Sequence, residues 1–192
     1  MGERKAGLLQ IKKASESDLR EVARLYETLI EYMDSKGVNY PKWEKGVYPS
    51  EESAARAISE GTLYLACADG RTLGSLVINR VPEPAYRNAK WLIDTRYRGE
   101  CYENVAVLHT LAISPDAMES GVATRLLAFA EELAKSEGLG SLRLDLVFGN
   151  EPAKRLYLKC GYSYIDTLSL GYEAQGIPYF ELYEKPLQQA GS

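Results

Sequence analysis

Several residue types that build common sites are scarce in this sequence. The chain has one histidine, His109, and three cysteines, Cys67, Cys101 and Cys160, which stand far apart. No C-x-x-C pair occurs and a single histidine cannot complete a usual zinc set, so we expect no metal site. Two of the cysteines lie in apolar segments, which predicts reduced core residues in a cytoplasmic protein. A cysteine-dependent hydrolase is a poor alternative, because no cysteine has a loop or elbow context.

Long apolar runs and an excess of positive charge are also missing. No stretch is apolar for long enough to be a signal peptide or a membrane span, so we expect no membrane partner. The net charge of −4 argues against nucleic-acid binding, which needs a basic face, and is compatible with a cationic small substrate. A length of 192 residues suits one domain over 1–192. Its core is expected at about 8–185, with a polar, frayed tail at 186–192.

Hydrophobic periodicity predicts eleven elements in the order β-α-α-β-β-β-α-β-α-β-β. The helices are predicted at 19–36, at 51–60, from 122 onward and from 151 to 160, where Ser50 and Asn150 are expected as N-caps. The strands are predicted at 8–13, 62–68, 72–81, 105–113, 141–147, 162–172 and 179–185.

Two segments lack a clear period and carry aromatic side chains. The loop at 38–49 contains Tyr40, Trp43 and Tyr48, and these either anchor the loop to the core or form the wall of a pocket. The insertion at 83–100 contains Trp91 and is expected to be irregular with one short helix. It forms either a lid and substrate wall or ordinary surface packing. We take all four aromatic residues as candidates for substrate binding.

The stretch at 105–137 reads as a buried strand, a tight loop and an amphipathic helix. The loop brings Gly121 and Ala123 to the start of the helix, where backbone N–H groups are unpaired and the helix dipole is positive. Small residues let an anion approach the backbone closely. The segment therefore predicts a phosphate or pyrophosphate site, with an ordinary strand-to-helix turn as the alternative.

This segment resembles motif A of the GNAT superfamily of N-acetyltransferases. Leu111-Ala112-Ile113 matches the end of the family strand, and Gly121-Val122-Ala123 matches the phosphate loop. Met118 departs from the pattern, because the family usually has Arg or Gln there and a thioether cannot donate a hydrogen bond. Residues 150–162, NEPAKRLYLKCGY, are similar to the family's motif B. The resemblance covers the chain from about residue 8 to residue 185.

The resemblance implies an α/β (α+β) fold of the GNAT acyl-CoA N-acyltransferase type. Such a fold has a mixed, mostly antiparallel sheet of about six to seven strands and about four helices. It implies acetyl-CoA as cofactor, with the thioester held by backbone groups of a splayed or bulged strand at Leu111, Ala112 and Ile113. The remaining cofactor contacts are implied at Met118, Glu119, Ser120, Gly121, Val122, Ala123, Thr124, Asn150, Ala153 and Tyr157. Glu119 is expected to point to solvent, because its carboxylate would repel a pyrophosphate.

Tyr157 matches the family tyrosine that lies near the cofactor sulfur, which implies a general acid, and a core tyrosine is the alternative. His109 is either the general base or a hydrogen-bonded core histidine. Glu103 is a weaker candidate base that would act through water. Asp145 lies on the polar face of its predicted strand, where it either receives the substrate ammonium or pairs with a cation such as Arg143.

The sequence thus favours an acetyl-CoA-dependent N-acetyltransferase that acts on the primary amine of a small or amino-acid-like molecule. Transfer would occur by direct attack in a ternary complex. The alternative is a non-catalytic acyl-CoA-binding or regulatory domain of the same fold, which the departure at Met118 keeps open. We expect a monomer or homodimer.

Overall fold

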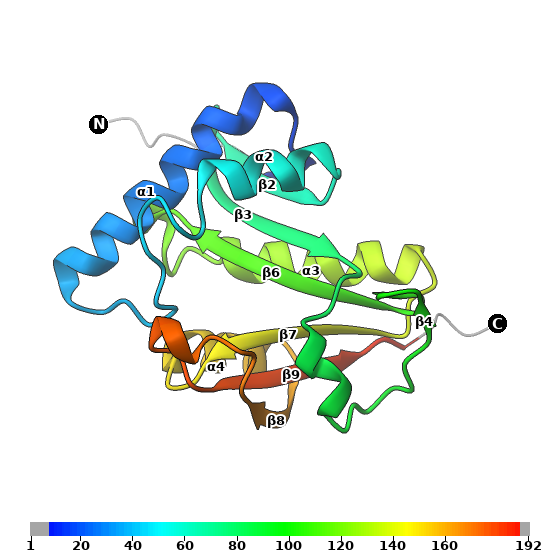
Figure 1. The fold of residues 1–192 in the computed structure, drawn as a ribbon. Helices are drawn as coiled ribbons and strands as arrows, with labels where there is room; N and C mark the ends of the chain where they lie inside the picture. The colour runs from blue at the N-terminus through cyan, green and yellow to red at the C-terminus, as the bar shows by residue number, and fades with distance from the viewer. Residues whose placement is uncertain (1–7, 189–192) are drawn as a thin grey trace. The chain divides into compact units, whose positions relative to one another are not determined.

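The computed structural model describes residues 8–188 and contains seven strands in one sheet and four α-helices within that range (Figure 1). The helices are α1 (Leu19–Lys36), α2 (Glu51–Ser59), α3 (Val122–Ser136) and α4 (Glu151–Lys159). The strands are β1 (Gln10–Lys13), β2 (Leu63–Ala68), β3 (Arg71–Asn79), β6 (Val105–Ile113), β7 (Ser141–Val147), β8 (Ser163–Leu168) and β9 (Phe180–Pro186).

The strand order in the sheet is β1-β2-β3-β6-β7-β9-β8. The pairs β1–β2, β2–β3, β7–β9 and β8–β9 are antiparallel, whereas β6 and β7 are parallel. The predicted mixed, mostly antiparallel sheet with four helices is therefore confirmed.

The described chain forms two compact units. Unit 1 consists of residues 8–39, 43–77 and 110–126, and unit 2 consists of residues 40–42, 78–109 and 127–188. The expectation of a single domain over residues 1–192 stays a prediction.

Unit 1 has its core where α1 and α2 cover β2 and β3 (Figure 1). Local residues determine where α1 ends and where α2 begins. Gly37 is a left-handed C-cap of α1, and the Ser50 hydroxyl accepts from the Ser53 N–H at the start of α2. Burying one large apolar side chain contributes about 1.5–3 kcal/mol, which makes this interface the main support of α1. The buried side chains of α1 are Val22, Leu25, Tyr26, Leu29, Ile30 and Met33.

Unit 2 has a core between its strands and the insertion at 83–100. The insertion contains the predicted short helix as the 3₁₀ turn η2 (Pro84–Asn88), and also a hairpin of β4 (Tyr97–Arg98) and β5 (Cys101–Tyr102) that the sequence pattern did not predict. Two-residue strands are too short to show an alternating pattern. The buried cluster consists of Tyr86, Tyr102, Val105, Val107 and Leu182.

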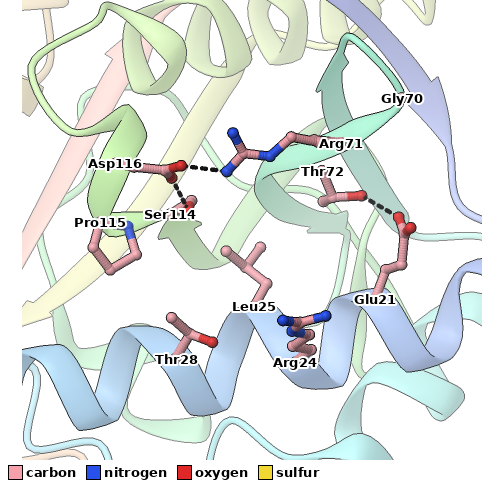
Figure 2. A pocket seen from close by; sticks show the side chains of 10 residues that line it. All are labelled: Glu21, Arg24, Leu25, Thr28, Gly70, Arg71, Thr72, Ser114, Pro115 and Asp116. Carbon is pink, nitrogen blue, oxygen red and sulfur yellow. Dashed lines mark hydrogen bonds and ion pairs between the residues drawn. The ribbon is translucent and has the colours of Figure 1, made fainter.

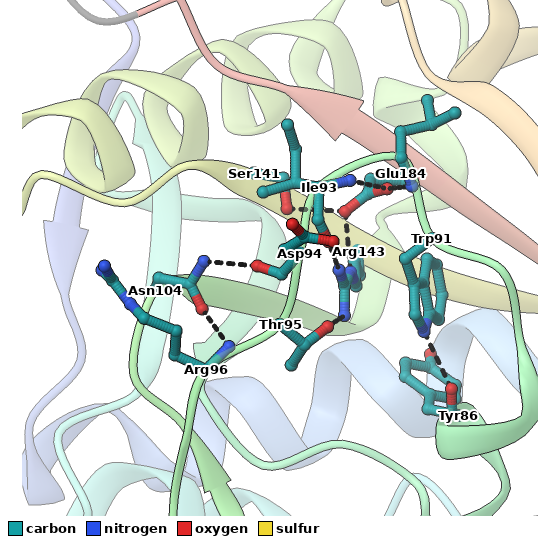
Figure 3. A network of polar contacts seen from close by, with 11 residues as sticks. Tyr86, Trp91, Ile93, Asp94, Thr95, Arg96, Asn104, Ser141, Arg143 and Glu184 are labelled. Carbon is teal, nitrogen blue, oxygen red and sulfur yellow. Dashed lines mark hydrogen bonds and ion pairs between the residues drawn. The ribbon is translucent and has the colours of Figure 1, made fainter.

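A fully buried ion pair anchors the insertion to the sheet (Figure 3). Arg143 on β7 donates from Nε to Glu184 on β9 at 2.8 Å, and both side chains are inaccessible to solvent. The guanidinium also donates to the Thr95 hydroxyl and the Ile93 carbonyl, and it lies 4.2 Å from the centre of the Trp91 ring. Arg143 is therefore not the partner of Asp145 that one sequence interpretation suggested.

Several predicted boundaries were wrong by a few residues. The strand predicted at 162–172 ends at Leu168, because residues 169–172 leave the strand and lead to a short 3₁₀ helix at Glu173–Gln175. The expected frayed tail at 186–192 is wrong at its start, since Pro186 belongs to β9 and the buried Leu187 donates its N–H to the Gly140 carbonyl at 2.8 Å. Residues 1–7 and 189–192 lie outside the described range.

The cysteines are free, as predicted, but all three are half-buried and none belongs to the fully buried core. Between residues 8 and 188, no three His, Cys, Asp or Glu side chains are grouped so as to hold a metal ion. No helix in the same range has the length and apolar character needed to cross a membrane.

Candidate functional site

Strand β6 carries an irregularity directly before the residues expected to hold the thioester. Thr110 has a φ of 48°, a left-handed conformation that is strained for a β-branched residue, at a cost of about 1–3 kcal/mol. Its hydroxyl is hydrogen-bonded to that of Tyr48. This distortion agrees with the splayed or bulged strand that the family resemblance implies. Ala112 is buried, whereas Leu111 and Ile113 are half-buried.

The parallel pairing of β6 with β7 is short. The register runs from Val105 opposite Ser141 to Val107 opposite Arg143 and ends there, although both strands continue. Two residues beyond the last pair, each strand carries one of the predicted site residues, His109 on β6 and Asp145 on β7.

The loop between β6 and α3 has the geometry of an anion cradle. Glu119 has a φ of 62° and Gly121 a φ of 86°, and left-handed residues in such a loop turn successive N–H groups toward one side. The first backbone bond of α3 runs from Arg125 N to Gly121 O. Within residues 8–188, the N–H groups of Glu119 and of residues 121–124 have no acceptor. Free donors at the N-terminus of a 15-residue helix suit phosphate oxygens.

Gly121 has a positive φ, which favours glycine, and a Cβ there would meet no atom of the described chain within 4 Å. The space beside its backbone is therefore open, and close approach of an anion stays a prediction. Ser120 departs from its expected role, because its backbone N–H already donates to the Ala117 carbonyl at 3.3 Å and its hydroxyl donates to the same carbonyl at 2.5 Å. Glu119 is exposed, which confirms that it points to solvent. Met118 is 38% exposed.

Unit 2 contains a cluster of carboxyl and phenol groups around Asp145. The buried Tyr86 hydroxyl donates to Asp145 Oδ2 at 2.7 Å. The Tyr172 hydroxyl donates to Glu83 Oε1 at 3.4 Å, and one turn of η2 joins Glu83 to Tyr86 through a backbone bond of 3.0 Å. Burial raises the pKa of Asp145 to about 6. The hydrogen bond from Tyr86 lowers this pKa in part, and the negative charge of Glu83 raises it further.

Tyr157 on α4 lies beside this cluster and is only 8% exposed. Burial, with a further contribution from the Asp145 charge, raises the pKa of the Tyr157 hydroxyl well above its usual value, so the phenol keeps its proton at neutral pH. The hydroxyl makes no hydrogen bond to any residue between 8 and 188, whereas the ring packs against Tyr162 and Tyr183. Tyr157 is thus both a core tyrosine and a free proton donor.

The contacts of His109 favour the hydrogen-bonded alternative over the general base. Its Nε2 lies 3.0 Å from Asn79 Oδ1. This amide oxygen also accepts from the Val81 N–H, so it is an acceptor and Nε2 is the donor. Burial lowers the pKa of His109 to about 4, against a smaller effect of a hydrogen bond with the Val81 backbone. A ring this weakly basic takes a proton poorly at neutral pH. Glu103 forms ion pairs with Arg98 at 3.1 Å and Arg96 at 3.8 Å on the surface.

The remaining candidates are divided between structural and accessible positions. The Asn150 side chain caps α4 by accepting from the Ala153 N–H at 3.3 Å. Trp43 packs against the core of unit 1, and Trp91 donates from its ring nitrogen to the Tyr86 carbonyl at 2.8 Å (Figure 3). Tyr40 and Tyr48, the other aromatic candidates for substrate binding, are 41% and 44% exposed.

A separate pocket of about 400 Å³ opens in unit 1 beside α1 (Figure 2). Arg71 pairs with Asp116 across it, and the Thr72 hydroxyl donates to Glu21 at 2.9 Å. No predicted site residue lines this pocket. Its lining residues all belong to unit 1, so it is not part of the cluster around Asp145 in unit 2.

The fold, the distorted strand and the free N–H groups at the start of α3 define a protein of the acyltransferase class. The chain matches the model of the Acetyltransferase (GNAT) family over residues 24–162. It therefore belongs to the GNAT family, whose members transfer acyl groups and generally use acetyl-CoA. No curated protein matches the chain by sequence.

Solved structures share the fold at low sequence identity. An acetyltransferase of the GNAT family from Streptococcus agalactiae is 21% identical, with a TM-score of 0.74 over 94% of this chain and 96% of that chain. The ribosomal-protein-S18-alanine N-acetyltransferase of Escherichia coli is 16% identical, with a TM-score of 0.66 over 96% of this chain and 97% of that chain. Identities this low establish the fold and leave the acceptor of this chain open.

Three residues of the acid–base cluster were missed by sequence reasoning. Tyr86, Glu83 and Tyr172 lie in the irregular insertion and in the segment between β8 and β9. Their only sequence signal was the concentration of tyrosine and proline in segments without a period, which does not show what they contact.

Proposed function

We propose that the protein is an acetyl-CoA-dependent N-acetyltransferase that acts on the primary amine of a small or amino-acid-like molecule, by direct attack in a ternary complex. The observation that supports this proposal is that unit 2 holds a phenol that keeps its proton, Tyr157, within the electrostatic influence of a carboxyl group of raised pKa, Asp145. Tyr157 offers a proton, and Asp145 is able to take one near neutral pH.

The cradle at the start of α3 supports acetyl-CoA as the cofactor. The free N–H groups of residues 119 and 121–124 suit the oxygens of a pyrophosphate, and they do not need the side chain that Met118 fails to provide. Acetyl-CoA, when bound, supplies the acetyl group as a thioester. The backbone after the Thr110 distortion would hold the pantetheine arm and the thioester carbonyl.

Asp145 and Tyr157 would divide the proton chemistry between them. Asp145 Oδ2 is occupied by the Tyr86 hydroxyl, so Oδ1 remains to accept a proton from the substrate ammonium. A carboxyl with a pKa of about 6 is largely ionised at pH 7 and still basic enough for this task. Tyr157 keeps its proton at Oη at neutral pH and would act as the general acid.

The test combines cofactor binding with two matched substitutions. Calorimetric titration with acetyl-CoA and with dephospho-coenzyme A measures the cradle, and release of free thiol in an amine screen measures transfer. We expect Tyr157→Phe to lower kcat by about a hundredfold with cofactor affinity retained. Tyr164→Phe is the control, because Tyr164 is exposed and its hydroxyl contacts only Thr167. Failure of acetyl-CoA to bind at millimolar concentration would overturn the proposal.

The pH dependence gives an independent check on Asp145. If Asp145 is the base, kcat/KM rises with pH through about 6 and then levels off, because the carboxylate is the active form. Asp145→Asn should remove this limb of the profile as well as lowering the rate. A profile that is unchanged in Asp145→Asn would remove Asp145 from the mechanism.

A further inference from the structure

The cluster in unit 2 holds two carboxyl groups that lack a cationic partner. Neither Asp145 nor Glu83 forms an ion pair with any Lys or Arg between residues 8 and 188. Each keeps one oxygen free, because only Oδ2 of Asp145 and Oε1 of Glu83 accept hydrogen bonds. Both side chains are half-buried.

The most deeply buried acids of the described chain are paired with cations: Asp18 with Lys12 at 2.7 Å, Glu181 with Lys154 at 3.2 Å and Glu184 with Arg143 at 2.8 Å. Asp166, half-buried like Asp145 and Glu83, forms no ion pair within the described range and accepts the Thr167 N–H. Leaving carboxylates desolvated and unpaired costs free energy, and proteins retain such arrangements mainly where a ligand completes them.

The two unpaired carboxyl groups also influence each other. Burial raises the pKa of Glu83, and the Glu83 charge contributes to the raised pKa of Asp145. Like charges in one partly desolvated site repel, so a ligand that brings two positive charges relieves more of this cost than a ligand that brings one. The phenols of Tyr86 and Tyr172 fix the position of each carboxyl group.

The free hydroxyl of Tyr157 is the second observation that points to a ligand here. It belongs to a side chain that is more than nine-tenths buried, has no hydrogen-bond partner in the described chain, and lies within the electrostatic reach of Asp145. The oxygen itself is not enclosed, unlike the unbonded Ser75, Tyr102 and Tyr162 hydroxyl oxygens of the described chain, so a ligand can reach it. A proton donor near Asp145 marks that end of the cluster as the reacting end.

We propose that the acceptor is a small dication, such as a diamine, whose reacting nitrogen contacts Asp145 and whose second cationic group pairs with Glu83. This inference rests on the proposed acetyltransferase function and names its substrate class. Glu83 is then a residue that determines specificity, and Tyr172 and Tyr86 are positioning residues.

The kinetic test compares amines that differ by one charge. We expect wild-type protein to prefer 1,4-diaminobutane over 1-aminobutane by at least about tenfold in kcat/KM, a difference of roughly 1.4 kcal/mol. Glu83→Gln should reduce this preference to about twofold or less. Glu100→Gln is the matched control, because it removes one exposed negative charge from the same insertion and should keep the preference.

A binding measurement supplies a readout other than turnover. Calorimetric titration with 1,4-diaminobutane at pH 6, in the presence of coenzyme A and in buffers of different ionisation enthalpy, should show proton release, since a bound cation shifts Asp145 to its ionised form. Asp145→Asn should reduce the release, and Asp145→Asn combined with Glu83→Gln should abolish it, because the pKa of Glu83 is raised as well.

The outcomes separate the inference from the function on which it rests. Acetyl-CoA binding together with equal kcat/KM for the diamine and the monoamine would overturn the dication and leave the acetyltransferase intact. A preference that survives Glu83→Gln would overturn the role of Glu83. Absence of acetyl-CoA binding would overturn both.

Discussion

Glu184 accepts four hydrogen bonds, two from β7 and two from the insertion, and its neutralisation should be costly. Oε1 accepts from Arg143 Nε at 2.8 Å and from the Ser141 hydroxyl at 2.7 Å, while Oε2 accepts from the backbone N–H groups of Leu92 and Ile93 (Figure 3). Glu184→Gln keeps the shape but replaces one acceptor oxygen by a donor and leaves the Arg143 guanidinium buried without its counter-ion.

The expected loss follows from burial and from the number of bonds. Removing one partner of a fully buried ion pair costs about 3–5 kcal/mol, because the remaining charge is desolvated and unpaired. In this variant the new side-chain NH₂ group would also lie against one of the donors that Glu184 now accepts from. Two donors in contact add about 1–3 kcal/mol to the loss of stability if the site cannot relax. We therefore expect Glu184→Gln to lower the free energy of unfolding by at least about 3 kcal/mol.

Urea denaturation at pH 7, followed by tryptophan fluorescence, measures this loss, since Trp91 lies against the same guanidinium. Glu103→Gln is the control, because its arginine partners are exposed and such surface pairs contribute about 0–1 kcal/mol. A loss below about 1 kcal/mol for Glu184→Gln would refute the reasoning, and so would equal losses for the two variants.

Two further predictions concern β3 and β6. Gly74→Ala should cost about 1–3 kcal/mol in thermal unfolding, because its Cβ would lie 2.8 Å from Ile113 Cδ1 and 3.0 Å from the Ala112 carbonyl oxygen, and an unchanged Tm would contradict this close packing. His109 has a lowered pKa of about 4 in the folded chain, so the unfolded chain binds its proton first and stability is lost as pH falls from about 6.5 to 4. His109→Gln should flatten that part of the stability curve, whereas a curve of unchanged slope would show that other groups cause it.

Much of the fold could be predicted because its signals are local. The end of α1 at Gly37 and the start of α2 at Ser50 follow from residues whose conformational preferences do not depend on distant contacts. The seven strands of the sheet were predicted, although their ends were less exact. The end of β8 at Leu168 and the β4–β5 hairpin depend on tertiary contacts and have no distinct pattern.

The candidate site was only partly predictable for the same reason. Asp145 and Tyr157 were found through strand alternation and a family motif, but their surroundings could not be read. Tyr86 is 59 residues from Asp145 in the chain, and Tyr172 is 89 residues from Glu83. Periodicity also could not distinguish a basic His109 from one whose ring is buried and bonded to Asn79.

The last strand of the described chain is not an edge strand. β9 lies between β7 and β8, and it pairs with β7 along all seven of its residues. During synthesis, β7 and β8 therefore emerge before the strand that joins them, and their unpaired edges remain open until residue 186 has been made. A truncation that removes β9 would divide the sheet in its interior instead of shortening it at one side. β9 thus joins β8 to the rest of the sheet, and chains stopped before it should be unusually prone to aggregation.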